Sequence, residues 1–200
     1  MGRPVDHAKR QQLARRAVEI LKERGLDLSN QALADALGIK RPTLLYYFPS
    51  KQQIVEHALE GLLFEQAQFV IAKMEAEDHP LRQLYAQVRG VHAFHDGREE
   101  RIVFLSQAIA AAGIDKSSRF IEIGNLAFEA QRAIMRERLK QAIDDGRMHA
   151  CDVESLIRLI RSTVDGLMVQ RVMTGCDLAP IHEFLWDHVL RPLMRDEEEK

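Results

Sequence analysis

Residues 41–48 carry the side chains whose types and spacing best suit chemistry with an outside partner. In a helix over this stretch, Leu44, Tyr47 and Phe48 share one face, because residues three and four apart are neighbours. The opposite face carries one guanidinium, one phenol and two apolar groups, from Arg41, Tyr46, Pro42 and Leu45. A helix that is merely solvated on that side is expected to show Lys, Glu or Gln. The pattern therefore indicates a surface that binds something.

Two preceding segments are placed to hold this helix. A helix is predicted over residues 6–24, ending at Gly25, and a short one follows Ser29 and ends at Gly38, a residue suited to a left-handed turn. Eight helical residues do not stay folded alone, so the short helix must pack against its neighbours. Two short helices joined by a tight turn, the second of which exposes an arginine and a tyrosine, predict a helix-turn-helix.

Charge is divided unevenly along the 200 residues. Residues 1–51 carry ten Lys or Arg and five Asp or Glu, for a net charge of +5, whereas the rest of the chain carries −7. A basic head on an acidic body is typical of a nucleic-acid-binding module joined to a regulatory part, although surface charge also fluctuates in proteins of other kinds. We therefore expect two domains, residues 1–51 and 52–200.

Composition narrows the class of protein further. Apolar residues make up 46% of the chain, no strand-like alternation is present, and no apolar run reaches the roughly 18 residues of a membrane span. Two cysteines do not make a disulfide framework or a metal cluster. We expect an all-α, cytoplasmic protein of about nine helices, with the body helices over residues 51–77, 80–94, 98–112, 116–145, 153–174 and 180–194.

Residues 28–54 resemble the helix-turn-helix of the tetracycline-repressor (TetR) family of bacterial transcription regulators. The resemblance lies in Gly38-Ile39, Thr43-Leu44 and the run Tyr47-Phe48-Pro49-Ser50-Lys51. It implies a homodimer that binds double-stranded DNA at a palindromic operator and responds to a small, largely apolar effector. It also implies an N-terminal three-helix DNA-binding head on a C-terminal body for ligand binding and dimerisation.

The resemblance assigns DNA contacts residue by residue. It implies phosphate or groove contacts from the start of the second helix, base contacts from the exposed face of the third, and a phosphate contact at the start of the fourth. The residues are Ser29, Asn30, Gln31, Lys40, Arg41, Pro42, Thr43, Leu45, Tyr46, Tyr47 and Lys51. Arg41 contacts either a guanine edge or a phosphate. Many relatives have a small polar cap at the position of Lys40 and an aromatic residue at that of Leu45, so this chain departs from the pattern there.

The last two predicted helices are apolar over most of their circumference and must be buried on two sides. The resemblance identifies them with the four-helix dimer interface of the family. The predicted interface residues are Leu156, Ile160, Val164, Leu167, Phe184, Leu185 and Val189. We expect Asp165 to be structural and Gly166 to permit close approach of backbones.

The body is also expected to enclose an effector cavity, apolar with a few polar groups. The candidate lining residues are Phe69, Tyr85, Val88, His92, Phe104, Phe128, Gln131, Met135 and Met168. Such a stripe at helical spacing is also what a plain core shows.

Enzymatic chemistry finds little support in the sequence. His92 and His95 have a spacing that could hold a metal, but further ligands are lacking, and histidines also suit a helix C-terminus. No nucleophile–base set stands out. We therefore expect no enzyme, metal or cofactor. The alternative function is a helical ligand-binding or adaptor protein whose head no longer reads DNA, favoured only by the departures at Lys40 and Leu45.

Overall fold

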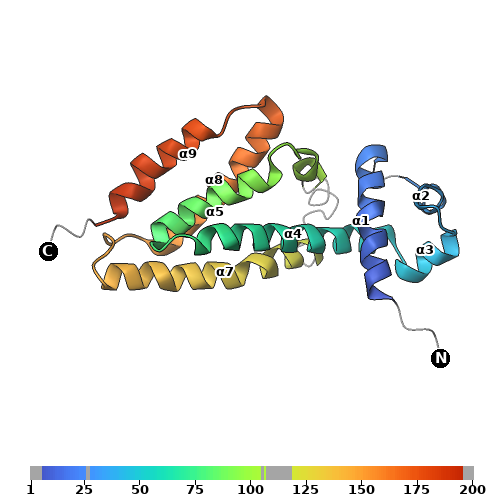
Figure 1. The fold of residues 1–200 in the computed structure, drawn as a ribbon, viewed down its shortest axis with the longest axis horizontal. Coiled ribbons are helices and arrows are strands. Elements are labelled where there is room, and N and C mark those ends of the chain that lie inside the picture. Colours follow the sequence, from blue (N-terminus) through green and yellow to red (C-terminus); the bar gives the residue numbers. More distant parts are fainter. Residues whose placement is uncertain (1–5, 26–27, 105, 107–118, 196–200) are drawn as a thin grey trace. The chain divides into compact units, whose positions relative to one another are not determined.

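The computed structural model describes residues 6–25, 28–104, 106 and 119–195 (Figure 1). Within these ranges every regular element is a helix, apart from one isolated antiparallel bridge between Met148 and Met194. The predicted all-α class is confirmed. No helix in the described ranges has both the length and the apolar character that crossing a membrane requires. The chain divides into two units, Met1–Leu63 with Phe104–Gly124, and Phe64–Val103 with Asn125–Lys200.

The first unit contains three short helices and the beginning of a long one. They are α1 (His7–Arg24), α2 (Asn30–Leu37), α3 (Arg41–Tyr47) and the first half of α4 (Lys51–Glu75). Three of the four begin where a side chain replaces missing backbone partners: the Asp6 carboxylate accepts from the Lys9 N–H at 3.1 Å before α1, and the Ser29 hydroxyl accepts from the Ala32 N–H at 3.1 Å before α2. Ser50 Oγ accepts from the Gln53 N–H at 3.3 Å before α4.

A glycine turn sets the path from α2 to α3. Gly38 has φ of +70°, a left-handed conformation that side chains with a Cβ rarely adopt. The Ile39 N–H bonds to the Ala34 carbonyl at 3.0 Å, which satisfies a carbonyl at the end of α2. α2 packs against both α1 and α3. The turn thus lets two short helices share one small core.

The core of the first unit is formed by apolar residues at helical spacing, as the sequence predicts. The fully or nearly fully buried ones are Leu13, Ala14, Ala17, Val18, Leu21, Leu33, Ala34, Leu37, Leu44, Tyr47, Phe48, Ile54, Val55 and Leu59. The last three lie on α4, which is why α4 up to Leu63 falls in the first unit rather than beginning the second at residue 52.

The second unit is a helical bundle. Its described elements are the rest of α4, α5 (Pro80–His95), most of α7 (Arg119–Asp144), α8 (Val153–Thr174) and α9 (Ala179–Leu185). α5 packs against α8 and α9, and the shared core includes Met74, Leu84, Val88, Met135, Leu139, Leu156, Ile160 and Leu190. The helix predicted over residues 98–112 is described only in part: residues 98 and 99 are not helical, residues 100–104 and 106 are, and residues 105 and 107–112 lie outside the described residues.

The C-terminal segment is not the single helix that its periodicity predicts. After α9 the backbone widens into a π-helix, η1 (Trp186–Leu190), and then tightens into a 3₁₀ turn, η2 (Arg191–Leu193). Pro192 has no N–H to continue an α-helical ladder, and its ring clashes with the carbonyl four residues earlier. The segment then ends beside the α7–α8 connection, where the His149 N–H bonds to the Leu193 carbonyl at 2.8 Å.

Candidate functional site

The two faces of α3 differ as the sequence predicts. Leu44 is 1% exposed, and Tyr47 and Phe48 are 9% and 0% exposed, so this side anchors the helix in the core of the first unit. Tyr46 is 48% exposed, and Arg41 also lies on the surface. Pro42 is exposed, and Thr43 and Leu45 are half-buried. An exposed guanidinium and phenol on a rigidly anchored short helix make a surface suited to a groove.

The start of α3 has no side-chain cap. Lys40 occupies the N-cap position with extended backbone angles, φ −73° and ψ 143°, and its side chain makes no capping bond. A Ser, Thr, Asp or Asn there would add about 1 kcal/mol of stability. Pro42 in the first turn removes one N–H that would lack a partner in any case. The Thr43 N–H bonds to the Lys40 carbonyl at 2.9 Å, so the donor that the missing cap leaves in the first turn of α3 is the Arg41 N–H, beside the exposed ammonium of Lys40.

The residues predicted at the start of α2 have local partners. Ser29 Oγ caps the helix, and a hydroxyl that accepts one bond keeps a proton to donate. Gln31 is exposed, and its amide nitrogen donates to Asp35 Oδ1 at 2.8 Å. Asn30 is half-buried as the first helical residue. The helix N-terminus, with its positive dipole end, favours a phosphate at this position.

Three basic residues of the first unit serve the fold itself. The Arg10 guanidinium lies over the Phe48 ring at 5.4 Å, and Arg16 Nη2 donates to the Leu37 carbonyl at 3.2 Å, at the negative end of α2. Lys51 Nζ donates to the Leu28 carbonyl at 2.9 Å, which fixes the segment that enters α2. Sequence reasoning missed this role of Lys51, because the partner lies 23 residues away.

Three of the nine predicted effector residues line one cleft in the second unit. Phe128, Gln131 and Met135 of α7 line it together with residues of α5 and α8. The enclosed volume is about 30 Å³, which is room for one water molecule. We name this site the effector cleft; its other lining residues are Leu84, Gln87, Arg132, Ile157, Ile160 and Arg161.

The other predicted effector residues lie elsewhere. The Phe69 ring contacts Phe94, with centroids 5.8 Å apart, and the Tyr85 ring contacts Trp186 at 5.1 Å. None of these six other residues lines the effector cleft. Helical periodicity identifies the apolar faces of helices but not where a cleft opens between two of them. Val88 and His92 are buried in the second unit, and Met168 packs against its core. Phe104 is also buried but belongs to the first unit.

His92 and His182 form a hydrogen-bonded pair between α5 and α9. His92 Nε2 lies 3.1 Å from the Val164 carbonyl, so it must carry the proton and donate. His92 Nδ1 then accepts from His182 Nε2 at 2.7 Å, and the two rings are nearly parallel, at 11°. Desolvation lowers the pKa of both imidazoles, that of His182 to about 4 with nearby His92 and Arg89 adding to the effect.

His95 and His79 are also engaged within the second unit. His95 Nε2 donates to Gln66 Oε1 at 2.9 Å, and His79 Nδ1 accepts from the Leu81 N–H at 3.2 Å as the N-cap of α5. Among the described residues, no group of three or more His, Cys, Asp or Glu side chains is placed to hold a metal ion. His95 thus connects α5 to α4, and His79 caps the beginning of α5.

The pKa of His95 leads to a prediction about stability. Burial, helped by Arg101 and His92, lowers the pKa to about 4, and Nδ1 is buried without a partner. The unfolded chain takes up this proton near pH 6.5 and the folded chain only near pH 4, so stability is full above pH 6.5 and falls below it. Between pH 7 and pH 5, His95 is expected to lower the free energy of unfolding by about 2 kcal/mol.

Urea unfolding at pH 7 and pH 5 measures this loss. His95→Gln is expected to lose less stability than the parent over the same pH interval, whatever its absolute stability. His188→Gln, at an exposed histidine of η1, is the control and should keep the full loss. An equal loss in all three proteins would contradict the prediction.

Five of the seven predicted interface residues are buried within the single chain. Leu156, Ile160, Val164, Leu167 and Leu185 are 2–8% exposed and contribute to packing of the bundle. They therefore offer little area to a second subunit. Of the remaining two, Phe184 is 60% exposed and Val189 is half-buried. The sequence shows that α8 is apolar on two sides but not which side faces the bundle.

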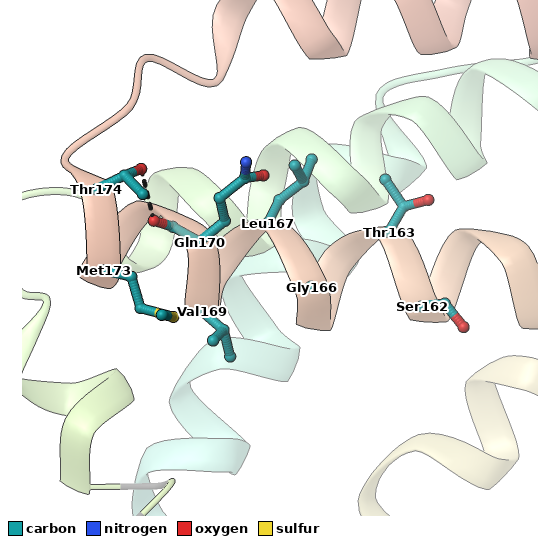
Figure 2. Close-up of a pocket in the computed structure, with 8 residues that line it drawn as sticks. All are labelled: Ser162, Thr163, Gly166, Leu167, Val169, Gln170, Met173 and Thr174. Carbon is teal, nitrogen blue, oxygen red and sulfur yellow. Dashed lines mark hydrogen bonds between the residues drawn. The ribbon is translucent and has the colours of Figure 1, made fainter.

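The outward side of α8 is apolar as well. Val169 and Met173 are 47% and 78% exposed, and Leu159 and Val172 are 48% and 37% exposed. An open groove of about 530 Å³ follows this side, and Figure 2 shows its lining residues from Ser162 to Thr174. At Gly166 an added Cβ would meet no atom of the chain within 4 Å. The outward residues Leu159, Val169, Val172, Met173 and, on α9, Phe184 are named here the α8–α9 apolar face.

Asp165 is engaged on the same helix. Its carboxylate accepts from Arg161 Nε at 2.6 Å, one turn earlier, as expected of a structural residue.

These features define a class: an all-helical protein whose N-terminal helix-turn-helix exposes a basic and aromatic recognition helix. Residues 13–58 match the family model described as bacterial regulatory proteins, tetR family. This match covers the helix-turn-helix and the beginning of α4, so the N-terminal part of the chain is similar to the DNA-binding domain of TetR-family transcription regulators. The family model is that of transcription regulators.

Solved structures support the same fold over nearly the whole chain. The ketosteroid transcriptional regulator KstR2 of Mycobacterium tuberculosis is 22% identical, with a TM-score of 0.66 over 96% of this chain and 98% of that one. A regulator from Saccharomonospora viridis in complex with choline is 16% identical, with a TM-score of 0.75 over 96% and 100%. FadR from Bacillus subtilis in complex with stearoyl-CoA is 16% identical, with a TM-score of 0.71 over 90% and 96%. No curated protein sequence matches the chain.

Proposed function

We propose that the protein is a homodimeric repressor that binds a palindromic operator and is released by a small effector with a largely apolar body. The observation that carries this proposal is the exposure of Arg41 and Tyr46 on a helix anchored by three buried residues. A buried Arg41 would have removed the recognition surface. A regulator of this kind acts on chromosomal DNA and so works in the cytoplasm.

The DNA contacts are sorted by type. Arg41, Pro42 and Leu45 face base edges in the major groove, where Arg41 suits guanine and Leu45 offers apolar contact to a thymine methyl. Contacts to phosphates position the head without reading sequence. The residues proposed for phosphate or groove-edge contacts are Ser29, Asn30, Gln31, Lys40, Thr43, Tyr46, Tyr47 and Lys51. Lys51 combines this role with its bond to the Leu28 carbonyl.

Dimerisation is proposed through the α8–α9 apolar face, in place of the five buried residues. Exposed apolar side chains on consecutive elements, with a glycine that leaves space, suit close packing against a second copy. Two heads bind successive major grooves about 34–36 Å apart, so the operator repeats at that spacing with twofold symmetry.

The effector binds in the effector cleft and favours the dimer conformation whose heads misfit the operator. Regulators with this fold have been captured with choline and with stearoyl-CoA, so a ligand in this body is in keeping with the fold. α4 contributes residues to both units and begins at Lys51, so it is the element proposed to carry the change.

Selection of bound sequences from a pool of random duplexes tests the proposal. A palindromic consensus with one-turn spacing is expected, together with a complex that weakens as salt is raised. An adaptor with a degenerate head would enrich no sequence, and that result would overturn the proposed function.

Lys40 gives a prediction for a phosphate contact. Lys40→Ala is expected to weaken binding to operator and to random DNA by similar factors, and to reduce the slope of log affinity against log salt by about one. Fluorescence anisotropy across a salt series measures both. Lys9→Ala, at an exposed lysine of α1, is the control for loss of charge. An unchanged salt slope for Lys40→Ala would show that its ammonium contacts no phosphate.

A further inference from the structure

The effector cleft has an apolar floor, and the polar side chains at its rim are all hydrogen-bond donors. The floor is made by Leu84, Phe128, Met135, Ile157 and Ile160. The rim consists of two amides and two guanidinium groups, from Gln87, Gln131, Arg132 and Arg161. None of the described lining residues is an Asp or a Glu. Every polar side chain at the cleft can therefore donate hydrogen bonds, and the only formal charges among them are positive.

The partners of these donors lie outside the cleft lining. Arg161 Nε bonds to Asp165 at 2.6 Å, and Arg132 bonds to Glu129 through Nη2 at 2.6 Å and Nε at 3.0 Å. Both are pairs on one helix, three or four residues apart and partly exposed, and such pairs contribute only a few tenths of a kcal/mol. A guanidinium has five N–H donors, so an anion can be bound alongside, or in exchange for, these carboxylates.

Gln131 is poorly satisfied in the present arrangement. Its amide nitrogen donates to the sulfur of Met74 at 3.5 Å, and a thioether is a weak acceptor. An oxygen of a ligand would be a better partner for this amide than sulfur is. The cleft thus has a third donor whose hydrogen bond an anionic ligand would improve.

We propose that the effector is an amphipathic organic anion: a carboxylate or comparable acidic group attached to an apolar body. The acidic group binds Arg161 and Arg132 at the rim, with Gln131 as a further donor, and the apolar body covers the floor. This inference rests on the proposed function and names the chemical class of its effector. A cationic head group is disfavoured by the same two guanidinium groups.

Phe128 connects binding of the anion to opening of the cleft. The Arg161 guanidinium lies over the Phe128 ring at 5.0 Å, a cation–π contact that holds the ring against the rim. The enclosed 30 Å³ is too small for such a ligand, so a side chain must move. An anion that binds the Arg161 guanidinium draws it toward the ligand and away from the ring. Phe128 can then turn away and admit the apolar body.

Three probes with the same tail and different head groups test the proposal on the purified 200-residue protein. They are decanoate, decanol and decyltrimethylammonium, each titrated by calorimetry below the concentration at which it forms micelles. Decanoate is expected to bind about tenfold more tightly than decanol, since hydrogen bonds to charged groups contribute about 1.5–3 kcal/mol. Decyltrimethylammonium is expected to bind more weakly than either.

Charge variants assign the effect to the cleft. Arg161→Gln is expected to weaken decanoate binding about tenfold but not to weaken decanol binding, because loss of the Arg161–Phe128 contact only eases opening of the cleft. Asp165→Asn removes the competing carboxylate and is expected to tighten decanoate binding. Arg158→Gln is the matched control, because Arg158 lies exposed on the same helix and does not line the cleft. Circular dichroism checks that each variant keeps the helical fold.

Equal binding of decanoate and decanol, no binding of decanoate, or equal losses in Arg161→Gln and Arg158→Gln would each overturn the inference. The selection experiment on DNA is independent of these titrations. A protein that enriches a palindrome but prefers decanol therefore keeps the proposed function and loses only the proposed class of effector.

Discussion

Arg41→Ala is expected to reduce operator affinity by about 1–3 kcal/mol, or 5- to 150-fold, and to relax base preference at particular positions. The loss is expected because the exposed guanidinium of Arg41 is the group of α3 that best matches a base edge, and alanine leaves that edge without a partner. Binding to random DNA should change much less. Repeating the sequence selection with the variant shows which positions lose information.

Arg41→Lys separates the two possible roles of the side chain. A lysine keeps the charge but not the planar fork that binds guanine through two hydrogen bonds. If Arg41 contacts only phosphate, Arg41→Lys should restore most of the affinity and the full preference. If Arg41→Ala leaves affinity and preference unchanged, α3 is not the recognition helix.

The second large effect is expected at the α8–α9 apolar face. Val169→Glu places a carboxylate where the proposed partner subunit packs, and a buried unpaired charge costs several kcal/mol. The dissociation constant of the dimer is expected to rise at least about 100-fold. Sedimentation at micromolar concentration should then show a monomer of 22.9 kDa in place of a dimer of twice that mass. Operator affinity should fall with it, because one head binds only half a palindrome.

Ile134→Glu is the matched control for this experiment. Ile134 on α7 is 46% exposed against 47% for Val169, so the two substitutions change equally exposed aliphatic residues. The control should remain dimeric. Dimers in both variants would remove the α8–α9 apolar face as the interface, and monomers only in the control would move the interface to α7.

The head could be predicted from the sequence almost residue by residue. Its helices are short and bounded by strong local signals, such as the Ser29 cap, the left-handed turn at Gly38 and Pro42 in the first turn of α3. The buried side of α3 followed from spacing alone, since only one arrangement places Leu44 and Phe48 together. Local chemistry therefore determines most of this unit.

The body could be predicted only coarsely. Helix α8 is apolar on two sides, and spacing does not decide whether Leu156 or Leu159 faces the bundle. The nine residues predicted to bind the effector do not share one cleft for the same reason, because a cleft depends on how separate helices pack. The change from α9 to η1 also escaped the periodicity, since a π-helix alters the phase of the side chains beyond Leu185.

The position of Trp186 in η1 gives the protein an optical reporter of its own. It is the single tryptophan of the chain, and its ring lies 5.1 Å from Tyr85 and 5.7 Å from the Arg82 guanidinium. Light emitted on excitation at about 295 nm, where tyrosine absorbs little, therefore originates at the junction of η1 with α5. Any event that loosens this junction should shift the emission to longer wavelength, without a label having been attached.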